Sequence, residues 1–347
     1  MKQLSILVVS RTPELLSRLL ASLDSAWSGN ADTVEVLCSW NGSDADASRI
    51  QPARLPFRIA QREPYHFARN MNALAAQASG EVVVFANDDL IADPGALDAA
   101  YQRLAERAEV GIVGACLRTS EGELAHAGIS FNREGSAYHR LETFAALTHP
   151  SCSQETLVPA VTGAFLAMRL SQFSSLQFSE DFLVCGEDVV LCLDCRRLLG
   201  LGVLFCPAMS GIHDAESTRA KTPGQEGQSV DMQAMQIAYR NMRQRADQDA
   251  LLMELQLAQD EADTLRSLCN ELKAREAPLH QRLQALEAEA ASLQEGLAKA
   301  LSEQQRSHAQ SQAVITRLEL EASLHSREQQ RLLARVQLLE AERSVRR

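Results

Sequence analysis

The sequence predicts an α/β domain with a mostly parallel central sheet, followed by a long α-helical coiled coil. Over residues 1–225, short apolar runs alternate with helical patterns, which is typical of parallel strands covered by helices on both faces. From about residue 231 the chain is dominated by Ala, Glu, Gln, Leu and Arg. We therefore expect an α/β domain at residues 1–225 and a helical region at residues 226–347.

The strands are predicted from apolar runs that are continuous rather than alternating, as in strands buried on both faces. These runs lie at residues 4–9, 34–38, 57–60, 82–86, 161–165 and 203–207. Helices are indicated by caps and by 3.6-residue patterns. They are expected after Thr12-Pro13 and at residues 67–78, 94–107 and 187–199, with a hairpin at residues 114–128.

The C-terminal region carries a seven-residue leucine repeat. Its members are Leu265, Leu272, Leu279, Leu286 and Leu293. This spacing predicts a long helix or coiled coil, and a single solvated helix is disfavoured because an exposed leucine seam is costly. Pro278 lacks a backbone N–H and clashes with the preceding turn, so we expect a kink or break near Ala277.

Composition limits the classes of function. The hydrophobic share of 46% is that of a globular protein, and the net charge of -11 argues against nucleic-acid binding. A phosphorylated ligand remains compatible with this charge if a divalent cation accompanies it. Because no export signal or membrane span is visible, we expect a cytoplasmic protein with at most peripheral contact at the inner membrane face.

The eight cysteines are scattered through expected strands and helices, which indicates reduced thiols. Cys192 and Cys195 form a C-x-x-C inside a helical pattern. Since no second Cys or His pair follows at zinc-finger spacing, we interpret both as buried helix residues.

The triplet Asn87-Asp88-Asp89 lies where the apolar run 82–86 ends. Ligands of open α/β sheets bind at the carboxyl ends of strands, and oxygen-rich side chains suit Mg²⁺ or Mn²⁺ with substrate phosphates. The alternative is that Asp88 and Asp89 are ordinary turn residues before the next helix. The triplet by itself leaves both interpretations open.

Three further features have a plain and a functional interpretation. Glu187 and Asp188 open a helix, where the dipole favours carboxylates, but one of them also suits a general base. His213 follows an apolar strand and suits a metal ligand, although most lone histidines have no such role. Thr162-Gly163 interrupts an apolar run at a point where a backbone can approach a ligand.

The order of the short motifs is more specific than any one of them. They are Ser10, Asn41-Gly42-Ser43, His66-Phe67-Ala68 with Asn72, Gly80-Glu81, Asn87-Asp88-Asp89, Gly114-Ala115-Cys116-Leu117, His126-Ala127-Gly128, Thr162-Gly163-Ala164, Glu187-Asp188-Val189 and His213-Asp214-Ala215-Glu216-Ser217. Over about residues 3–220 this series resembles the family 2 glycosyltransferases, which are inverting enzymes of the GT-A fold. The resemblance is strongest to bacterial members associated with cell-surface polysaccharide.

The resemblance implies roles for individual residues. Asp89 and His213 would hold a divalent metal, Mn²⁺ or Mg²⁺, and Asp188, with Glu187 beside it, would deprotonate the acceptor hydroxyl. The nucleotide-sugar donor would meet Ser10, Arg11, Trp40, Asn41, Arg69, Asn72, Asn87, Asp88, Thr162 and Gly163. The implied reaction is a metal-dependent, inverting transfer of a sugar to a hydroxyl of a glycan or lipid-linked glycan.

The chain departs from the family at three positions. Trp40 replaces an Asp that contacts the nucleotide, Val190 replaces a second Asp, and Arg11 replaces a common Tyr. Trp40 either stacks on the base or fills the pocket. These changes leave an alternative function, an inactive interaction protein, and a nucleotidyltransferase is a weaker third interpretation because Ser10-Arg11-Thr12-Pro13 is not a Gly-rich basic loop.

The chain also lacks a Gln-x-x-Arg-Trp motif, since its only tryptophans are Trp27 and Trp40. With no membrane span either, a non-processive enzyme is expected. We expect the coiled coil to form a homo-oligomer or to dock a partner protein.

Overall fold

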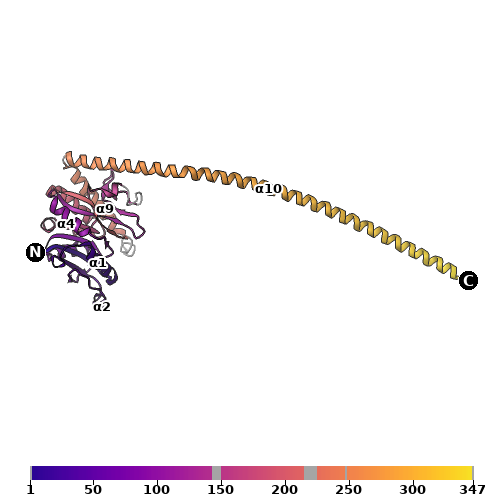
Figure 1. Ribbon diagram of the computed structural model, residues 1–347, viewed down its shortest axis with the longest axis horizontal. Coiled ribbons are helices and arrows are strands. Elements are labelled where there is room, and N and C mark those ends of the chain that lie inside the picture. The colour runs from indigo at the N-terminus through magenta and orange to yellow at the C-terminus, as the bar shows by residue number, and fades with distance from the viewer. Residues whose placement is uncertain (1, 143–149, 215–224, 247, 346–347) are drawn as a thin grey trace. The chain divides into compact units, whose positions relative to one another are not determined.

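The computed structural model describes residues 2–142, 150–214, 225–246 and 248–345. The chain divides into a compact unit, Met1–Cys269, and a second unit, Asn270–Arg347. The first unit contains a ten-stranded sheet with helices packed against it, and the second is helical (Figure 1).

The main sheet has ten strands in the described residues, and five of them contain a predicted apolar run and extend beyond it. The ten strands are β1 (Lys2–Ser10), β2 (Val34–Trp40), β3 (Phe57–Gln61), β4 (Gly80–Asn87), β5 (Ile91–Ala92), β6 (Val110–Arg118), β7 (Leu124–His126), β10 (Thr156–Leu157), β11 (Phe165–Arg169) and β12 (Gly202–Ile212). A separate hairpin pairs β8 (Ile129–Phe131) with β9 (Ala137–His139).

The helices of the described residues include every helix that the sequence predicts. They are α1 (Pro13–Ala26), η1 (Ala31–Thr33), α2 (Asp44–Ala47), α3 (Phe67–Ala75), α4 (Ala96–Glu106), α5 (Pro150–Ser153), α6 (Leu170–Leu176), α7 (Glu187–Leu199), α9 (Gln225–Arg243) and α10 (Gln248–Val345).

The sheet order is β10-β12-β6-β11-β4-β1-β2-β3. Strands β1, β2, β3 and β4 pair in parallel, and β6 pairs in parallel with β12. Strand β11 lies antiparallel between β4 and β6, so all six of these other strands run in one direction. The predicted α/β class with a mostly parallel sheet is therefore confirmed.

Strand β4 shows why the apolar runs are continuous. Val83 and Phe85 belong to the core on one face of the sheet, whereas Val82, Val84 and Ala86 belong to the core on the other. Helices α3, α6 and α7 cover the first face, and α1 and α4 cover the second. Because both faces are covered, alternate side chains are buried in turn and no polar face is left.

The prediction of a strand at residues 161–165 is wrong. Strand β11 begins only at Phe165. The backbone N–H groups of Thr162 and Gly163 donate to the side chains of His126 and Asp188 instead of to a neighbouring strand. Hydrogen bonds to side chains thus replace the backbone hydrogen bonds of a sheet, and residues 162–164 form a loop.

The compact unit extends past the predicted boundary at residue 225. Met235, Tyr239 and Met242 of α9 and Leu257 of α10 are buried in the same core as α7. Helix α10 continues through Pro278, so a break there is wrong, whereas a kink near Ala277 stays a prediction. Proline removes one hydrogen bond at a cost of about 3 kcal/mol, which the remaining turns of so long a helix can offset.

The described cysteines are all free thiols, and Cys192 and Cys195 are buried in α7 as predicted. Across the described residues, no helix is both long and apolar enough to cross a membrane.

Candidate active site

The carboxyl ends of β1, β4 and β12 place the predicted site residues at one edge of the sheet. Ser10 ends β1, Asn87 ends β4, and His213 directly follows β12. Parallel strands in one sheet present these ends side by side, where open α/β sheets bind ligands.

His213 lies against the triplet at the end of β4. Its Nε2 atom is 3.2 Å from Oδ1 of Asp89 and 3.1 Å from Nδ2 of Asn87. The side chains of His213 and Asp89 are only 12% and 7% exposed. Two residues separated by more than a hundred positions are thus brought together, as the sequence predicts. Ala215, Glu216 and Ser217 of the same motif lie outside the described residues.

Asp89 and His213 fit a divalent cation. Octahedral ligands at 2.0–2.1 Å stand about 3 Å apart when adjacent, close to the observed O–N separation. The described residues contain no group of three or more His, Cys, Asp or Glu that could hold a metal. This agrees with a cation that takes two protein ligands and completes its shell with water and substrate phosphates. An imidazole ligand suits Mn²⁺ better than Mg²⁺.

Asp188 lies in the first turn of α7 and is tied to the 162–164 loop. Its Oδ2 atom accepts the N–H of Gly163 at 2.7 Å, and Oδ1 accepts the N–H of Val189 at 2.8 Å. The loop is in turn bonded to β4, because the N–H of Asn87 donates to the carbonyl of Ala164 at 3.0 Å. One chain of contacts therefore joins Asp188 to the triplet and to His213.

Glycine at position 163 accommodates this close approach. A Cβ atom there would stand 3.1 Å from the Cβ of Asp188. The sequence suggested that a ligand approaches this backbone, and the structure shows that a catalytic candidate from the chain itself does so.

Asp88 points toward β1 rather than toward His213. Its Oδ2 atom accepts the hydroxyl of Ser10 at 2.7 Å. Burial raises the pKa of Asp88 to about 6, while the Ser10 hydrogen bond opposes the rise and the charge of Asp89 adds to it. The charge of Arg11 lies close enough to lower the same pKa. The two aspartates of the triplet thus occupy different environments.

His126 is a site residue to which the sequence gave no role. It is 1% exposed, and its Nε2 atom accepts the N–H of Thr162 at 3.3 Å. Nδ1 must then carry the proton, which it donates to Nδ1 of His139 at 2.8 Å. Burial lowers the pKa of His126 well below 6.5. The His-Ala-Gly motif was the available signal, but its spacing indicated only a hairpin.

Trp40 is buried in the core of the domain. The side chain is 1% exposed, belongs to the core and donates its indole N–H to the carbonyl of Ser43 at 3.0 Å. The neighbouring Asn41 donates its amide to the carbonyl of Glu63. Direct contact of Trp40 or Asn41 with a nucleotide stays a prediction.

Arg69 and Asn72 lie on α3, where they meet the segment before α7. Both ends of the Asn72 amide bind the backbone of Phe178, at 2.9 and 3.0 Å, which gives it a packing role. The exposed Arg69 pairs with Glu180 at 3.1 Å. Their predicted contacts with the donor also stay predictions, as does the role of Glu187 beside Asp188.

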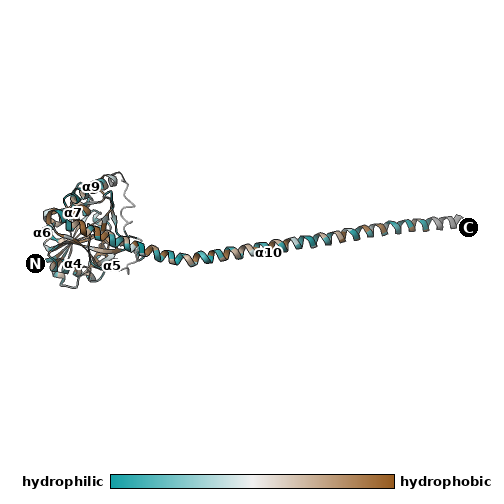
Figure 2. Ribbon diagram, turned by 90° about the horizontal axis from the view of Figure 1, so that it is seen from above, coloured by the Kyte–Doolittle hydropathy of each residue, from teal (hydrophilic) through white to brown (hydrophobic). Residues whose placement is uncertain are grey.

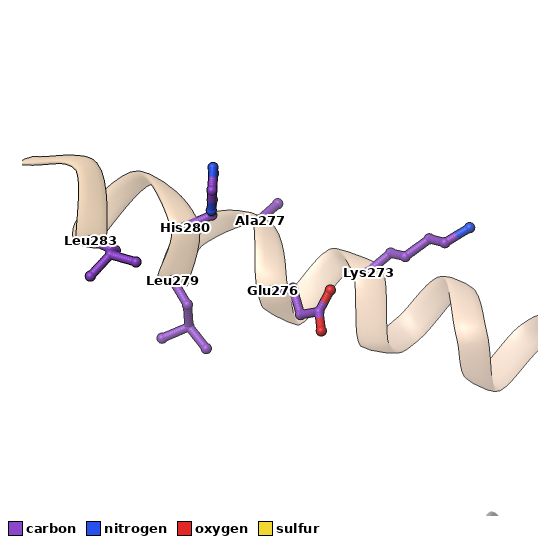
Figure 3. Close-up of a pocket in the computed structure, with 6 residues that line it drawn as sticks. All are labelled: Lys273, Glu276, Ala277, Leu279, His280 and Leu283. Carbon is purple, nitrogen blue, oxygen red and sulfur yellow. The ribbon is translucent and has the colours of Figure 1, made fainter.

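A hollow on helix α10 is unrelated to this site. It is lined by Lys273, Glu276, Ala277, Leu279, His280 and Leu283 (Figure 3). All six come from one stretch of helix, and Leu279 and His280 point to different sides of it. Side chains that diverge from one helix do not form a catalytic constellation.

Residues 3–245 match the family described as "Glycosyltransferase like family 2". The chain belongs to this family. The membership confirms the predicted family and, with it, the predicted glycosyltransferase class. The matched residues include α9 as well as the sheet.

Two curated relatives are similar to part of the chain. The O-antigen biosynthesis protein RfbC of Myxococcus xanthus is 37% identical over 174 residues, 47% of this chain and 13% of that protein. The uncharacterized protein y4gI of Sinorhizobium fredii is 30% identical over 200 residues, 54% of this chain and 20% of that protein. The chain therefore spans a fifth or less of the length of either relative.

Solved glycosyltransferases are similar at low sequence identity. A mannosyltransferase of Pyrobaculum calidifontis, in complex with GDP-Man and Mn²⁺, shares 16% identity at a TM-score of 0.48, covering 79% of this chain and 75% of that one. TarS of S. aureus shares 15% identity at a TM-score of 0.46, covering 67% and 39%. Likeness at this level assigns no substrate to this chain.

Proposed function

We propose that the chain is a metal-dependent, non-processive inverting glycosyltransferase. It would move a sugar from a nucleotide-sugar donor to a hydroxyl of a glycan or lipid-linked glycan in cell-surface polysaccharide biosynthesis. The observation that carries the proposal is the single chain of contacts joining Asp188, Asn87 and the Asp89–His213 pair. The O-antigen name of the Myxococcus relative supports the polysaccharide context.

In this proposal the transfer would use two parts of the site. A divalent cation held by Asp89 and His213 would supply Lewis-acid stabilisation of the departing diphosphate. Asp188 would take the proton of the acceptor hydroxyl, whose oxygen forms a bond to the anomeric carbon as the bond to the diphosphate breaks. The electron pair of the broken bond leaves with the nucleoside diphosphate, and direct attack inverts the anomeric centre.

The backbone N–H groups of Gly163 and Val189 hold both oxygens of Asp188. Its orientation is fixed by backbone atoms, whose positions do not depend on rotamers.

The proposal is tested by thermal unfolding with a panel of nucleotide sugars, with and without Mn²⁺. A donor should raise the melting temperature only when Mn²⁺ is present, and Asp89→Ala should remove that shift. Asp263→Ala is the matched control, because Asp263 is a 73% exposed carboxylate on α10. No shift with any donor, together with no turnover, would favour the alternative of an inactive interaction protein, for which the buried Trp40 is the supporting observation.

We further propose that the leucine stripe of α10 is covered by a second copy of this chain. Leu272, Leu279, Leu286 and Leu293 are between 47% and 69% exposed in the single chain. Polar and apolar residues are interspersed along the helix (Figure 2). Residues 270–337 contain nine basic and nine acidic side chains, so two copies meet without net repulsion. Each buried leucine contributes about 1.5–3 kcal/mol.

The mass of the full chain, measured by analytical ultracentrifugation, tests whether a second copy covers the stripe. Replacing Leu286 and Leu293 by Lys should convert an oligomer to a monomer. Replacing Gln281 and Ala288 by Lys on the opposite side of the helix should leave the mass unchanged. A monomeric wild-type chain would contradict the proposal that a second copy covers the leucine stripe. A partner protein would then be the remaining candidate to cover it.

A further inference from the structure

Helix α9 reaches back to the turn that precedes the candidate base. Its Asp231 is 3% exposed and faces this turn. The Oδ2 atom of Asp231 accepts the backbone N–H groups of Leu183 at 3.1 Å, Val184 at 2.7 Å and Cys185 at 3.2 Å. One carboxylate oxygen therefore fixes three successive residues.

Two side chains of this turn face solvent. The side chains of Leu183 and Val184 are 70% and 41% exposed, so they contribute little packing. Gly186 follows with φ +110° and is the N-cap of α7. Residues 183–185 precede this N-cap, and hydrogen bonds to a carboxylate are stronger than neutral ones. Asp231 therefore fixes the backbone immediately before α7 begins.

The same face of α9 also packs against the turn. Met235 lies four residues after Asp231, on the same side of the helix. A Cβ atom at Gly186 would stand 2.6 Å from Cγ and Sδ of Met235 and 3.1 Å from Phe182. A side chain at position 186 would therefore require Met235 or the turn to shift.

Helix α7 is also held at its other end. Arg196 of α7 pairs with Glu254 of α10 at 2.9 Å, and the hydroxyl of Tyr239 on α9 donates to the same carboxylate at 2.9 Å. Helices α7 and α9 pack together. The helix that carries Asp188 is thus braced at both ends by residues that follow the sheet.

We propose that Asp231 is a positioning residue for the transfer reaction. It holds residues 183–186 so that Asp188 keeps its hydrogen bond to Gly163 and its orientation toward the acceptor. Helix α9 is then a working part of the active site, although it lies beyond the last strand of the sheet. The inference rests on the proposed role of Asp188 as the base.

The test compares Asp231→Ala and Asp231→Asn with wild type in the full chain. Gln233→Ala is the matched control, because Gln233 is an exposed polar residue on the same helix. Hydrogen exchange is measured at the amides of residues 183–185 and of Gly163. Steady-state transfer is measured with the nucleotide sugar identified by thermal unfolding and its acceptor.

Asp231→Ala should speed exchange at all four amides and lower kcat about 100-fold, with the donor KM changed less than about twofold, since a small misplacement of a reacting group is costly. Asp231→Asn keeps an acceptor oxygen and should recover part of kcat. Gln233→Ala should match wild type.

Two results would overturn the role of Asp231: unchanged kcat in Asp231→Ala, or unchanged exchange at Gly163. If the wild type itself turns over no donor, the proposed function fails. The exchange of Gly163 then still decides whether Asp231 positions Asp188.

Discussion

The α/β domain and the part of α10 beyond Cys269 differ in how far their apolar side chains are buried. In the domain, apolar residues alternate between two cores and many are wholly buried, as Phe85 is. On α10, leucines from Leu272 onward are about half exposed or more. The domain therefore buries its apolar side chains within one chain, whereas the helix leaves a stripe of exposed leucines. The proposed chemistry lies in the first region and the proposed association in the second.

The largest effect of a single substitution is expected at Asp188 in the domain. Asp188→Asn should lower turnover at least about 100-fold, because a general base contributes 10²–10⁴-fold, while binding of the donor is retained. Asp194→Asn is the control, since Asp194 lies on the same helix and pairs with Arg197 away from the site. Kinetics and donor-induced stabilisation measure the two properties separately. Equal losses in both variants would contradict the assignment of the base.

Truncating a side chain should lower the free energy of unfolding of the domain much more in its core than in the leucine stripe of α10. Phe85→Ala should lower the free energy of unfolding of the domain by about 3–5 kcal/mol, because its ring packs 4.7 Å from Phe173 and 4.8 Å from Phe178. Leu293→Ala, at a 69% exposed position, should change it by less than about 0.5 kcal/mol.

Urea unfolding followed by tryptophan fluorescence measures this difference, because both tryptophans, Trp27 and Trp40, lie in the domain. A comparable loss in both variants would show that the helix and the domain unfold as one cooperative unit.

Acidification should destabilise the domain through His126. Its pKa is lowered by burial, so the unfolded chain, with a pKa near 6.5, binds the proton more readily than the folded chain. Stability is therefore full above pH 6.5 and is lost as the pH falls below it, by up to about 1.4 kcal/mol per pH unit. Urea unfolding at pH 7.5, 6.5 and 5.5 measures the slope. His126→Gln should flatten it, and an unchanged slope would exclude His126 as its source.

Removal of the stripe should have the smallest effect on the domain. A chain that ends at Cys269 keeps the compact unit, including Asp231 and Glu254. Its melting temperature should stay within about 2 °C of the full chain while its mass falls to that of a monomer. A large loss of domain stability would mean that the oligomer supports the fold.

The sequence by itself determined the elements and their class. Apolar runs such as Val82–Ala86 identified strands buried on both faces, and the seven-residue leucine spacing identified the long helix. These signals are local, because side-chain periodicity records which faces of one element are covered. The ordered motifs also placed the chain in its family, which was then confirmed.

Only the tertiary structure decided which side chains meet. The hydrogen bond from Gly163 to Asp188 and the hydrogen bonds from residues 183–185 to Asp231 join positions far apart in the chain. It also showed that Trp40 fills a core position and that Thr162 and Gly163 give their N–H groups to side chains. No periodicity encodes such contacts, because they depend on how separate elements pack once the sheet has formed.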